Sequence, residues 1–470
     1  MIRIKSFVRL AAVMLLVAAI AVPSFAARGS AKFTTFVAVG DSYGAGYEAG
    51  SLHERHQIFS WPAIIAQQVG LNLCQPSAVA ADTCFAQPLI SFPGLPSGEL
   101  ILTPTGSGLT AVPGSGSPAM IGFGRAYNNL SVPGYTVGAA LALTGAEPTS
   151  GLGQVILRAR GNEVDQAISL HPTFIAVWLG GNDFLGAVSQ GNPNLLTSTA
   201  AFTAAYNTML DKLIAGAPDA GIVVGSLPAN FAAAPLTARI PGILLNPADS
   251  KPVLIGGQPV PLIFDPGDGN IQALPPGSIV LLTALTRLQQ GAGIPPALKA
   301  VPPFNALPLA GTPLTNAETI TPAEQAIFST RITEYNAAIA ASAASHNVAV
   351  ADIKSLFDRF AASATSPIVI GPWSFTNTFA TGGIFSLDGT HLSDLGYILF
   401  ANEYIKAING AYGTHIPVAS ITKVLQNNDP DTAKSLGFSI PADVAAQMTS
   451  VFNAVSTAAP APASRRRVVH

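Results

Sequence analysis

The chain has 470 residues, of which 49% are hydrophobic and only 10% are charged, and its formal net charge is −2. That length allows one large domain or two ordinary ones, with ample material for a buried core. A nucleic-acid partner is not expected, because proteins that bind nucleic acid usually present a strongly basic surface.

The N-terminus has the pattern of an export signal. Basic residues precede an apolar run at 10–22, which is too short to span a bilayer comfortably. Ser24-Phe25-Ala26 matches a small-x-small cleavage site, so we expect cleavage after Ala26 and a secreted or periplasmic mature protein. An uncleaved membrane anchor is the alternative interpretation of the signal peptide at 1–26.

Strand-like and helix-like segments alternate along the rest of the chain. Apolar, β-rich runs predict strands at 33–39, 173–179, 221–227 and 347–351. Apolar residues at helical spacing predict helices from residue 61 onward and at 154–170, 199–215, 321–345 and 395–408. Strands that alternate with helices imply parallel β-α-β units, so we predict an α/β fold with a sheet covered on both faces.

Two of the predicted helices have clear start signals. Ser60 is placed to cap the helix that opens at Trp61. Thr321 and Glu324 form a capping box, and Pro322 occupies the first helical position between them. Both helices are therefore expected to begin at these residues.

Two long segments, at 87–124 and 231–315, interrupt the alternation. They are rich in Gly and Pro, and they are too apolar for ordinary disorder. We interpret them as ordered insertions around the mouth of a site, within a domain at 33–412. The C-terminal extension at 413–470 contains one helical pattern, at 441–455, and ends in Ala/Pro repeats and arginines that are typical of a flexible end.

The chain has two cysteines, Cys74 and Cys84. In an oxidising compartment we expect them to form one disulfide, which would stabilise the fold by roughly 2–3 kcal/mol. A metal site at the two cysteines is the weaker alternative, because no histidine lies near them in the sequence.

Four short blocks carry candidate chemistry. A Gly-Asp-Ser turn follows the first predicted strand, and Gly-Gly-Asn-Asp follows the second. An Asp-Gly-Thr-His block stands near the end of the chain, and an Asn-Asn-Leu-Ser-Val-Pro-Gly block lies between the two strands. The blocks are Gly40–Tyr43, Asn128–Gly134, Gly180–Asp183 and Asp388–His391.

In this order, the four blocks resemble those of the GDSL, or SGNH, hydrolase family of esterases and lipases. The family is named for a Ser, a Gly, an Asn and a His, which here are Ser42, Gly134, Asn182 and His391. The resemblance covers about 33–412, with the two insertions outside it. It implies a three-layer α/β/α sandwich with a flavodoxin-like parallel sheet of about five strands. One departure is Tyr43, which stands where the family name implies Leu.

The residue types suit the chemistry that the resemblance implies. A serine hydroxyl is a poor nucleophile at neutral pH and needs a base, for which His391 is the candidate. Asp388 can reach back across one turn to orient that histidine. An oxyanion needs donors placed in advance, and the Ser42 and Gly134 backbone N–H groups and the Asn182 amide would supply three. Glycine at position 134 would also let the backbone approach closely, since it has no Cβ.

Each candidate also has a purely structural interpretation. Ser42 could cap a helix after the first strand, and Gly134 could be only a turn glycine after Pro133. Asn182 could be a mere turn former. We interpret Asp41 and Asp183 as carboxylates that stabilise turns.

The histidines and acids leave a second set of alternatives. Asp394 could replace Asp388 as the acid that orients His391. A satisfied loop histidine is an alternative for His391, and it is the favoured interpretation of His53, His56, His171, His346, His415 and His470. The glycines Gly44, Gly46 and Gly50 do not match the spacing of a dinucleotide-binding loop. No metal cluster is apparent in the sequence, so we expect neither a metal nor an organic cofactor.

The resulting prediction is a serine esterase or lipase that cleaves carboxylic esters through an acyl-serine intermediate. The apolar insertions suggest a lipid ester or another substrate with an apolar acyl part. An enzyme with such a substrate could contact a membrane or lipid surface peripherally. A carbohydrate acetyl-esterase of the same family is the first alternative, and a non-catalytic surface binding protein on the same scaffold is the second. The sequence does not indicate an oligomeric state.

Overall fold

The computed structural model describes residues 27–103, 109–229, 234–237, 240–246, 249, 251–371 and 373–421. The expected signal peptide at 1–26 and the helical pattern at 441–455 lie outside the described residues. Within the described part of the chain, no helix combines the length and apolar character needed to cross a membrane.

The centre of the fold is a parallel sheet whose strands follow one another in chain order. It is formed by β1 (Phe36–Gly40), β4 (Phe174–Trp178), β5 (Gly221–Gly225) and β14 (Ala349–Ala351). Every residue of β1, β4 and β5 is buried. Full burial is expected for parallel strands that carry helices on both faces, and it explains why these strands are continuous apolar runs.

A further segment lies along the outer edge of β1. The Ala38 backbone N–H donates to Asn128 O at 2.8 Å, and Leu130 N donates back to Ala38 O at 2.9 Å. Val132 N donates to Gly40 O at 2.9 Å, so the segment 128–132 runs parallel to the whole strand. The sheet therefore has four assigned strands and one strand-like edge segment, which leads directly to Gly134.

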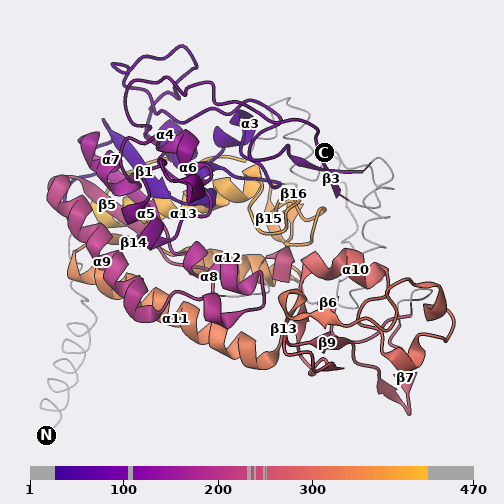
Figure 1. Cartoon of the computed structure of the whole chain (residues 1–470). Coiled ribbons are helices and arrows are strands. Elements are labelled where there is room, and N and C mark those ends of the chain that lie inside the picture. The colour runs from indigo at the N-terminus through magenta and orange to yellow at the C-terminus, as the bar shows by residue number, and fades with distance from the viewer. Residues whose placement is uncertain are drawn as a thin grey trace, which may run out of the picture.

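Helices cover both faces of this sheet (Figure 1). Trp61 stacks on Tyr404 with ring centroids 4.5 Å apart in one helical layer, and Phe202 stacks on Tyr335 at 4.1 Å in the other. The first layer contains α4 (Trp61–Gln68), α12 (Ile353–Ala362) and α13 (Asp394–Tyr412). The second contains α5 (Val137–Ala142), α7 (Glu163–Ser169), α9 (Thr199–Gly216) and α11 (Pro322–Ser345). The predicted three-layer α/β/α sandwich is confirmed.

The two predicted helix starts are also confirmed. The Ser60 hydroxyl accepts a bond from Ala63 N at 3.4 Å at the start of α4. Thr321 and Glu324 form both halves of the capping box at the start of α11.

The prediction of one helix over 154–170 was wrong. The structure has two helices there, α6 (Gly153–Ile156) and α7, separated by a turn. Arg158 and Ala159 have left-handed φ values of 55° and 56°, which a continuous right-handed helix cannot contain. Asn162 then caps α7 by accepting from Asp165 N at 2.8 Å, so the chain restarts a helix where the apolar spacing had suggested continuity.

The first insertion packs on the short helix α3 (Glu54–Gln57). The Gln57 side chain accepts from Ile90 N at 2.8 Å, and Gln87 donates to Gln57 O at 3.1 Å. The insertion also contains a hairpin of β2 (Leu100–Leu102) and β3 (Leu109–Ala111).

The second insertion has its own apolar core beside the N-terminal end of α11 (Figure 1). The Leu236 N–H donates to Gly389 O at 2.7 Å, which joins this insertion to the Asp388–His391 loop. Its short elements and the adjoining strand are β6 (Ile240–Pro241), β7 (Leu254–Ile255), β8 (Gln258–Pro259), β9 (Ile263–Asp265), β10 (Gln272–Ala273), β11 (Ile279–Val280), α10 (Leu285–Gln289), β12 (Leu314–Thr315) and β13 (Thr319–Ile320).

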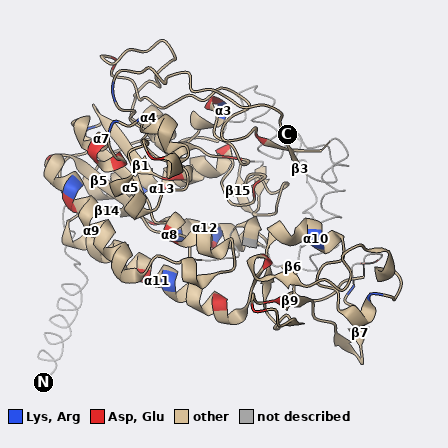
Figure 2. Cartoon of the chain, viewed as in Figure 1, with Lys and Arg blue, Asp and Glu red and all other residues tan. Residues whose placement is uncertain are grey.

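Other connections complete the described chain. Cys74 and Cys84 are joined in a disulfide with their Cα atoms 5.0 Å apart. The strands β15 (Ile368–Ile370) and β16 (Trp373–Phe375) form a hairpin before the last helix. After α13 the chain turns back along it, because Asn402 and Asn409 hold the backbone of residues 416–419. Charged residues are sparse over the described elements in Figure 2, in line with the 10% charged content of the sequence.

Candidate active site

The first block forms a tight turn from strand to helix at the carboxyl end of β1. Asp41 caps the short helix α2 (Ser42–Ala45), and its Oδ1 accepts a bond from Tyr43 N at 3.0 Å. Ser42 is the first residue of that helix and is only 6% exposed. The helix cap is therefore Asp41, which leaves the Ser42 hydroxyl free for another partner.

That partner is His391. The structure places His391 Nε2 2.8 Å from Ser42 Oγ, across 349 residues of sequence. The other ring nitrogen, Nδ1, lies 2.8 Å from Asp388 Oδ2. With Nδ1–H donating to the carboxylate, Nε2 is the basic nitrogen that can accept the serine proton. The three residues therefore form a continuous Ser–His–Asp chain.

Asp388 is fixed in its charged form. Its Oδ1 accepts from Thr390 N and His391 N at 2.9 and 2.8 Å, and its Oδ2 accepts from Gly50 N at 3.0 Å. Burial alone would raise the pKa of Asp388, but the charge of His391 and these hydrogen bonds lower it well below its usual value. A carboxylate held in this way orients the imidazole and stabilises its protonated form.

Asp394, the alternative acid, does not contact His391 through a hydrogen bond. Its side chain is fully buried at the start of α13, and its Oδ1 lies 3.0 Å from His56 Nδ1. The geometry therefore selects Asp388 as the partner of His391.

The second and third blocks meet beside this turn. Asn182 opens α8 (Asn182–Val188), and its amide nitrogen donates to Tyr135 O at 3.0 Å. Tyr135 directly follows Gly134, so the bond ties the two predicted oxyanion donors to each other. The amide nitrogen of Asn182 carries a second hydrogen that can point to a substrate.

The close approach of the Gly134 backbone to an oxyanion stays a prediction, and the structure shows a separate reason for glycine at this position. A Cβ built on Gly134 would meet no atom within 4 Å, so the surrounding protein would not obstruct a side chain there. The backbone instead has a φ of 85°, in the left-handed region that favours glycine. The requirement is therefore conformational.

Of the two acids that we interpreted as turn-stabilising, Asp41 caps the turn after β1, whereas the Asp183 side chain bonds to a distant helix. Asp183 Oδ2 accepts from Val137 N at 3.0 Å, which joins α8 to α5. Burial raises the pKa of Asp183, and burial also raises the pKa of Asp41 to about 7. Both carboxyl groups lie behind the site and are almost fully buried.

Sequence reasoning missed the residues that support the serine turn from below. Glu163 is fully buried, and its Oε2 accepts from Gly40 N at 3.2 Å. The Asn129 side chain donates to Gly44 O at 2.8 Å. A Cβ at Gly44 would lie 2.2 Å from Ser131 Oγ, so close packing accounts for this glycine. Asn129 and Ser131 belong to the second block and were detectable there, whereas no sequence signal pointed to Glu163.

A partly open apolar pocket lies next to the Ser42–His391–Asp388 chain. Tyr43, Gly181 and Thr390 line it, and each is a chain neighbour of Ser42, Asn182 or His391. The remaining wall is almost entirely apolar and comes from both the sandwich and the second insertion: Trp178, Phe184, Leu185, Val188, Leu227, Pro228, Ala229, Ala234, Leu236, Ile332 and Phe357.

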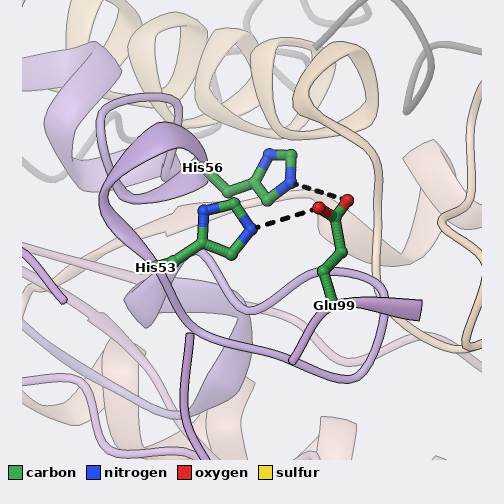
Figure 3. Close-up of side chains that lie close together, drawn as sticks. All are labelled: His53, His56 and Glu99. Atoms are coloured by element: carbon green, nitrogen blue, oxygen red, sulfur yellow. Dashed lines mark hydrogen bonds and ion pairs between the residues drawn. The ribbon is translucent and has the colours of Figure 1, made fainter. Parts of the chain in front are cut away.

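The interpretation of His53 and His56 as satisfied loop histidines holds only in part, because the His56 ring is hydrogen-bonded to Asp394 and Glu99. Both are fully buried, and His56 lies within α3. Neither ring nitrogen of His53 has a hydrogen-bond partner. The two imidazoles converge on Glu99, which the first insertion contributes (Figure 3). The expectation of no metal cluster overlooked this group because Glu99 is distant in sequence.

The fold and the site together define a three-layer α/β hydrolase with its Ser–His–Asp chain at the carboxyl edge of a parallel sheet, where such sheets place their ligands. The family model of the GDSL-like lipases and acylhydrolases matches residues 36–404, which is well over half of the chain. The chain therefore belongs to the GDSL-like lipase/acylhydrolase family, and the family resemblance inferred from the four blocks is confirmed. Membership supports an ester hydrolase.

The solved structures that match this chain are distant in sequence and have low TM-scores. An α/β hydrolase, LAE5, from the metagenome of Lake Arreo is 11% identical, with 83% of this chain and 99% of that chain covered at a TM-score of 0.34. The acetyl-xylooligosaccharide esterase Axe2 of Geobacillus stearothermophilus is 11% identical, with 83% of this chain and 98% of that chain covered at a TM-score of 0.34. An extracellular lipase of Streptomyces rimosus is 15% identical, with 80% of this chain and 98% of that chain covered at a TM-score of 0.31. No curated protein matches the sequence.

Proposed function

We propose that this protein is a secreted serine esterase or lipase that uses Ser42 as its nucleophile. The observation that carries the proposal is the Ser42–His391–Asp388 chain, with both side-chain contacts at 2.8 Å. The order of these contacts is the one needed for nucleophilic acyl transfer, because the base touches the nucleophile and the acid touches the base.

In the first half of the reaction, Ser42 Oγ attacks the ester carbonyl carbon while His391 Nε2 takes the hydroxyl proton. The carbonyl oxygen becomes an oxyanion, which the Ser42 and Gly134 N–H groups and the Asn182 amide stabilise. The intermediate then expels the alcohol, to which His391 returns the proton. This leaves an ester between the acyl group and Ser42.

In the second half, His391 removes a proton from a water molecule that attacks the acyl carbon. Collapse of this second intermediate breaks the bond to Ser42 Oγ, and His391 gives the proton back to the serine. The products are a carboxylic acid and an alcohol. Asp388 remains a carboxylate throughout, since it holds the imidazole and balances its transient positive charge.

The pocket supports a substrate with an apolar acyl part. Its walls bear almost no polar surface and begin at the neighbours of Ser42 and His391. A chain of methylene groups placed there would gain about 0.8 kcal/mol per buried CH₂. We therefore propose an aliphatic or lipid-like ester as substrate, met in solution or at a lipid surface.

The export of the mature protein is part of the proposal. The pattern of residues 1–26 supports a cleaved signal peptide. The disulfide between Cys74 and Cys84 supports an oxidising compartment.

The test is hydrolysis of p-nitrophenyl esters from acetyl to palmitoyl by residues 27–470 and by Ser42→Ala. Loss of activity in Ser42→Ala, together with loss of labelling by a fluorophosphonate, is expected. Ser329→Ala is the matched control, because Ser329 is an exposed residue of α11. An optimum at acetyl would favour the carbohydrate acetyl-esterase, and the absence of both activity and labelling would leave a non-catalytic binding protein.

A further inference from the structure

A second group of ionisable side chains lies buried outside the catalytic chain. Glu48, His53, His56 and Asp394 are 0% exposed, and Glu99 is 6% exposed. They come from the segment after α2, from α3 and its cap, from the first insertion and from the first turn of α13. Two imidazoles and three carboxyl groups in one dry place are costly unless something compensates their charges.

The two histidines point to one carboxylate (Figure 3). His56 Nε2 lies 3.3 Å from Glu99 Oε1, and His53 Nε2 lies 3.5 Å from Glu99 Oε2. The imidazole ring centroids are 4.4 Å apart. Three potential ligand atoms from three places in the sequence thus face one small volume.

Several polar atoms of this cluster have no hydrogen-bond partner. They include His53 Nδ1, Glu48 Oε1 and Asp394 Oδ2. His53 Nε2 and Glu48 Oε2 have only longer ionic contacts, at 3.5 Å to Glu99 Oε2 and at 3.3 Å to His56 Nδ1. Buried polar groups in folded proteins are nearly always satisfied, so a fully buried imidazole with a single 3.5 Å contact to a carboxylate needs an explanation. A bound cation would supply one.

We infer that His53 Nε2, His56 Nε2 and the Glu99 carboxylate hold a divalent transition-metal ion of the zinc class. Zinc takes imidazole nitrogen and carboxylate oxygen at about 2.0–2.2 Å, so two tetrahedral ligand atoms lie roughly 3.3–3.5 Å apart. The two nitrogen–oxygen separations at Glu99 fall in that range. Imidazole ligands argue against Mg²⁺ and Ca²⁺, which select oxygen.

The groups behind these ligands match a metal-site second shell. His56 Nδ1 lies 3.0 Å from Asp394 Oδ1 and 3.3 Å from Glu48 Oε2, so its N–H can donate to a carboxylate while Nε2 binds the ion. A carboxylate behind a metal-bound histidine fixes its tautomer and orientation. A divalent ion would also compensate the buried negative charge of the carboxylates around it.

The site would be structural and would support the active site through the backbone. Glu48 and Ser51 are paired backbone to backbone at 3.0 and 2.9 Å, which closes a turn around Gly50. The Gly50 N–H in this turn donates to Asp388 Oδ2 at 3.0 Å. The ion would therefore tie the first insertion, through Glu99, to the turn that holds the catalytic acid.

The first experiment measures the metal content of tag-free residues 27–470 expressed with added zinc. We expect about one zinc per chain after dialysis, and a loss of most of it in His53→Gln and in Glu99→Gln. His346→Gln is the matched control, because His346 Nε2 pairs with Asp211 at 2.9 Å in a more exposed position. Zinc that the two ligand variants retain as fully as the His346→Gln control would overturn the inference.

A second experiment uses the unaltered sequence, so that it does not depend on the folding of a variant. Removal of the ion with a chelator should lower the Tm, and Zn²⁺ but not Mg²⁺ should restore it. Co²⁺ added to the stripped protein should give the visible absorption of a tetrahedral nitrogen–oxygen site. A wild-type protein with less than about a tenth of a zinc per chain, no Tm response and no cobalt spectrum would refute the site.

Discussion

The hydroxyl group of Tyr43 donates a 2.6 Å hydrogen bond to the backbone carbonyl of Thr390. Tyr43 follows the nucleophile and Thr390 precedes the base, so this bond joins the two loops that carry Ser42 and His391. The Tyr43 ring also packs against the His391 ring, with centroids 5.4 Å apart. The residue that departs from the Gly-Asp-Ser-Leu pattern thus holds His391, the proposed base, in place.

Tyr43→Phe should therefore lower kcat about tenfold while it leaves KM for short esters nearly unchanged. The bond itself stabilises the fold by roughly 1 kcal/mol. Tyr127→Phe is the matched control, because Tyr127 is a buried tyrosine that donates to Met120 O at 2.6 Å in another part of the molecule. Thermal unfolding should show similar losses of stability in the two variants. Steady-state kinetics should show a loss of kcat in Tyr43→Phe alone. Equal kinetics in the two variants would contradict a positioning role.

Asn182→Ala should reduce kcat by about 10²–10³, since one oxyanion donor contributes roughly 2.7–4 kcal/mol to transition-state stabilisation. KM should change little, because that donor acts mainly on charge that develops during the reaction. Asn192→Ala serves as control, as Asn192 caps a short turn after α8 and accepts from Asn194 N at 3.0 Å. A rise in KM with kcat unchanged would argue that Asn182 binds substrate rather than the oxyanion.

Asp41→Asn should change how stability depends on pH. Burial raises the pKa of Asp41 from 3.8 to about 7. The folded chain therefore holds this proton more tightly than the unfolded chain, and the associated stability is lost as pH rises from about 4 to 7. The two pKa values correspond to a loss on the order of 4 kcal/mol.

Asparagine has no proton to lose and still caps a helix well. The free energy of unfolding of Asp41→Asn, measured in urea, should increase relative to that of the wild type between pH 4 and 7. At higher pH the difference between the two proteins should stay constant. Asp219→Asn is the control at an exposed site. Parallel stability curves for wild type and Asp41→Asn would show that Asp41 titrates normally.

Leu185→Trp should shorten the acyl chains that the enzyme accepts. Leu185 lines the apolar pocket and is only partly buried, so a larger ring can occupy pocket space without being forced into the core. In the p-nitrophenyl series, kcat/KM for palmitoyl and octanoyl esters should fall at least tenfold, and that for the acetyl ester should stay within about twofold. Leu195→Trp, at a 50% exposed position outside the pocket, is the control. A uniform fall along the series would place the acyl chain elsewhere.

Local sequence patterns predicted the sandwich and most of its elements. Four runs of apolar residues correspond to strands because parallel strands covered on both faces are uniformly buried, as β1 and β4 are. The capping box at Thr321 identified the start of α11 because a cap involves residues three apart. The break in the helix at Arg158 was not predicted because the apolar spacing continues across this residue, whereas the helical backbone conformation ends there.

The sequence by itself determined the chemical types available at the site, since the four blocks contain a serine, a histidine, an aspartate and candidate oxyanion donors. Only the tertiary structure brought Ser42 to His391 across 349 residues and selected Asp388 over Asp394. It also brought the side chains of Glu99 and His56 into contact, although the two residues are 43 positions apart in the sequence. Local periodicity reports which face of an element is buried, whereas the meeting of distant side chains depends on how whole elements pack, and no short window of sequence contains that information.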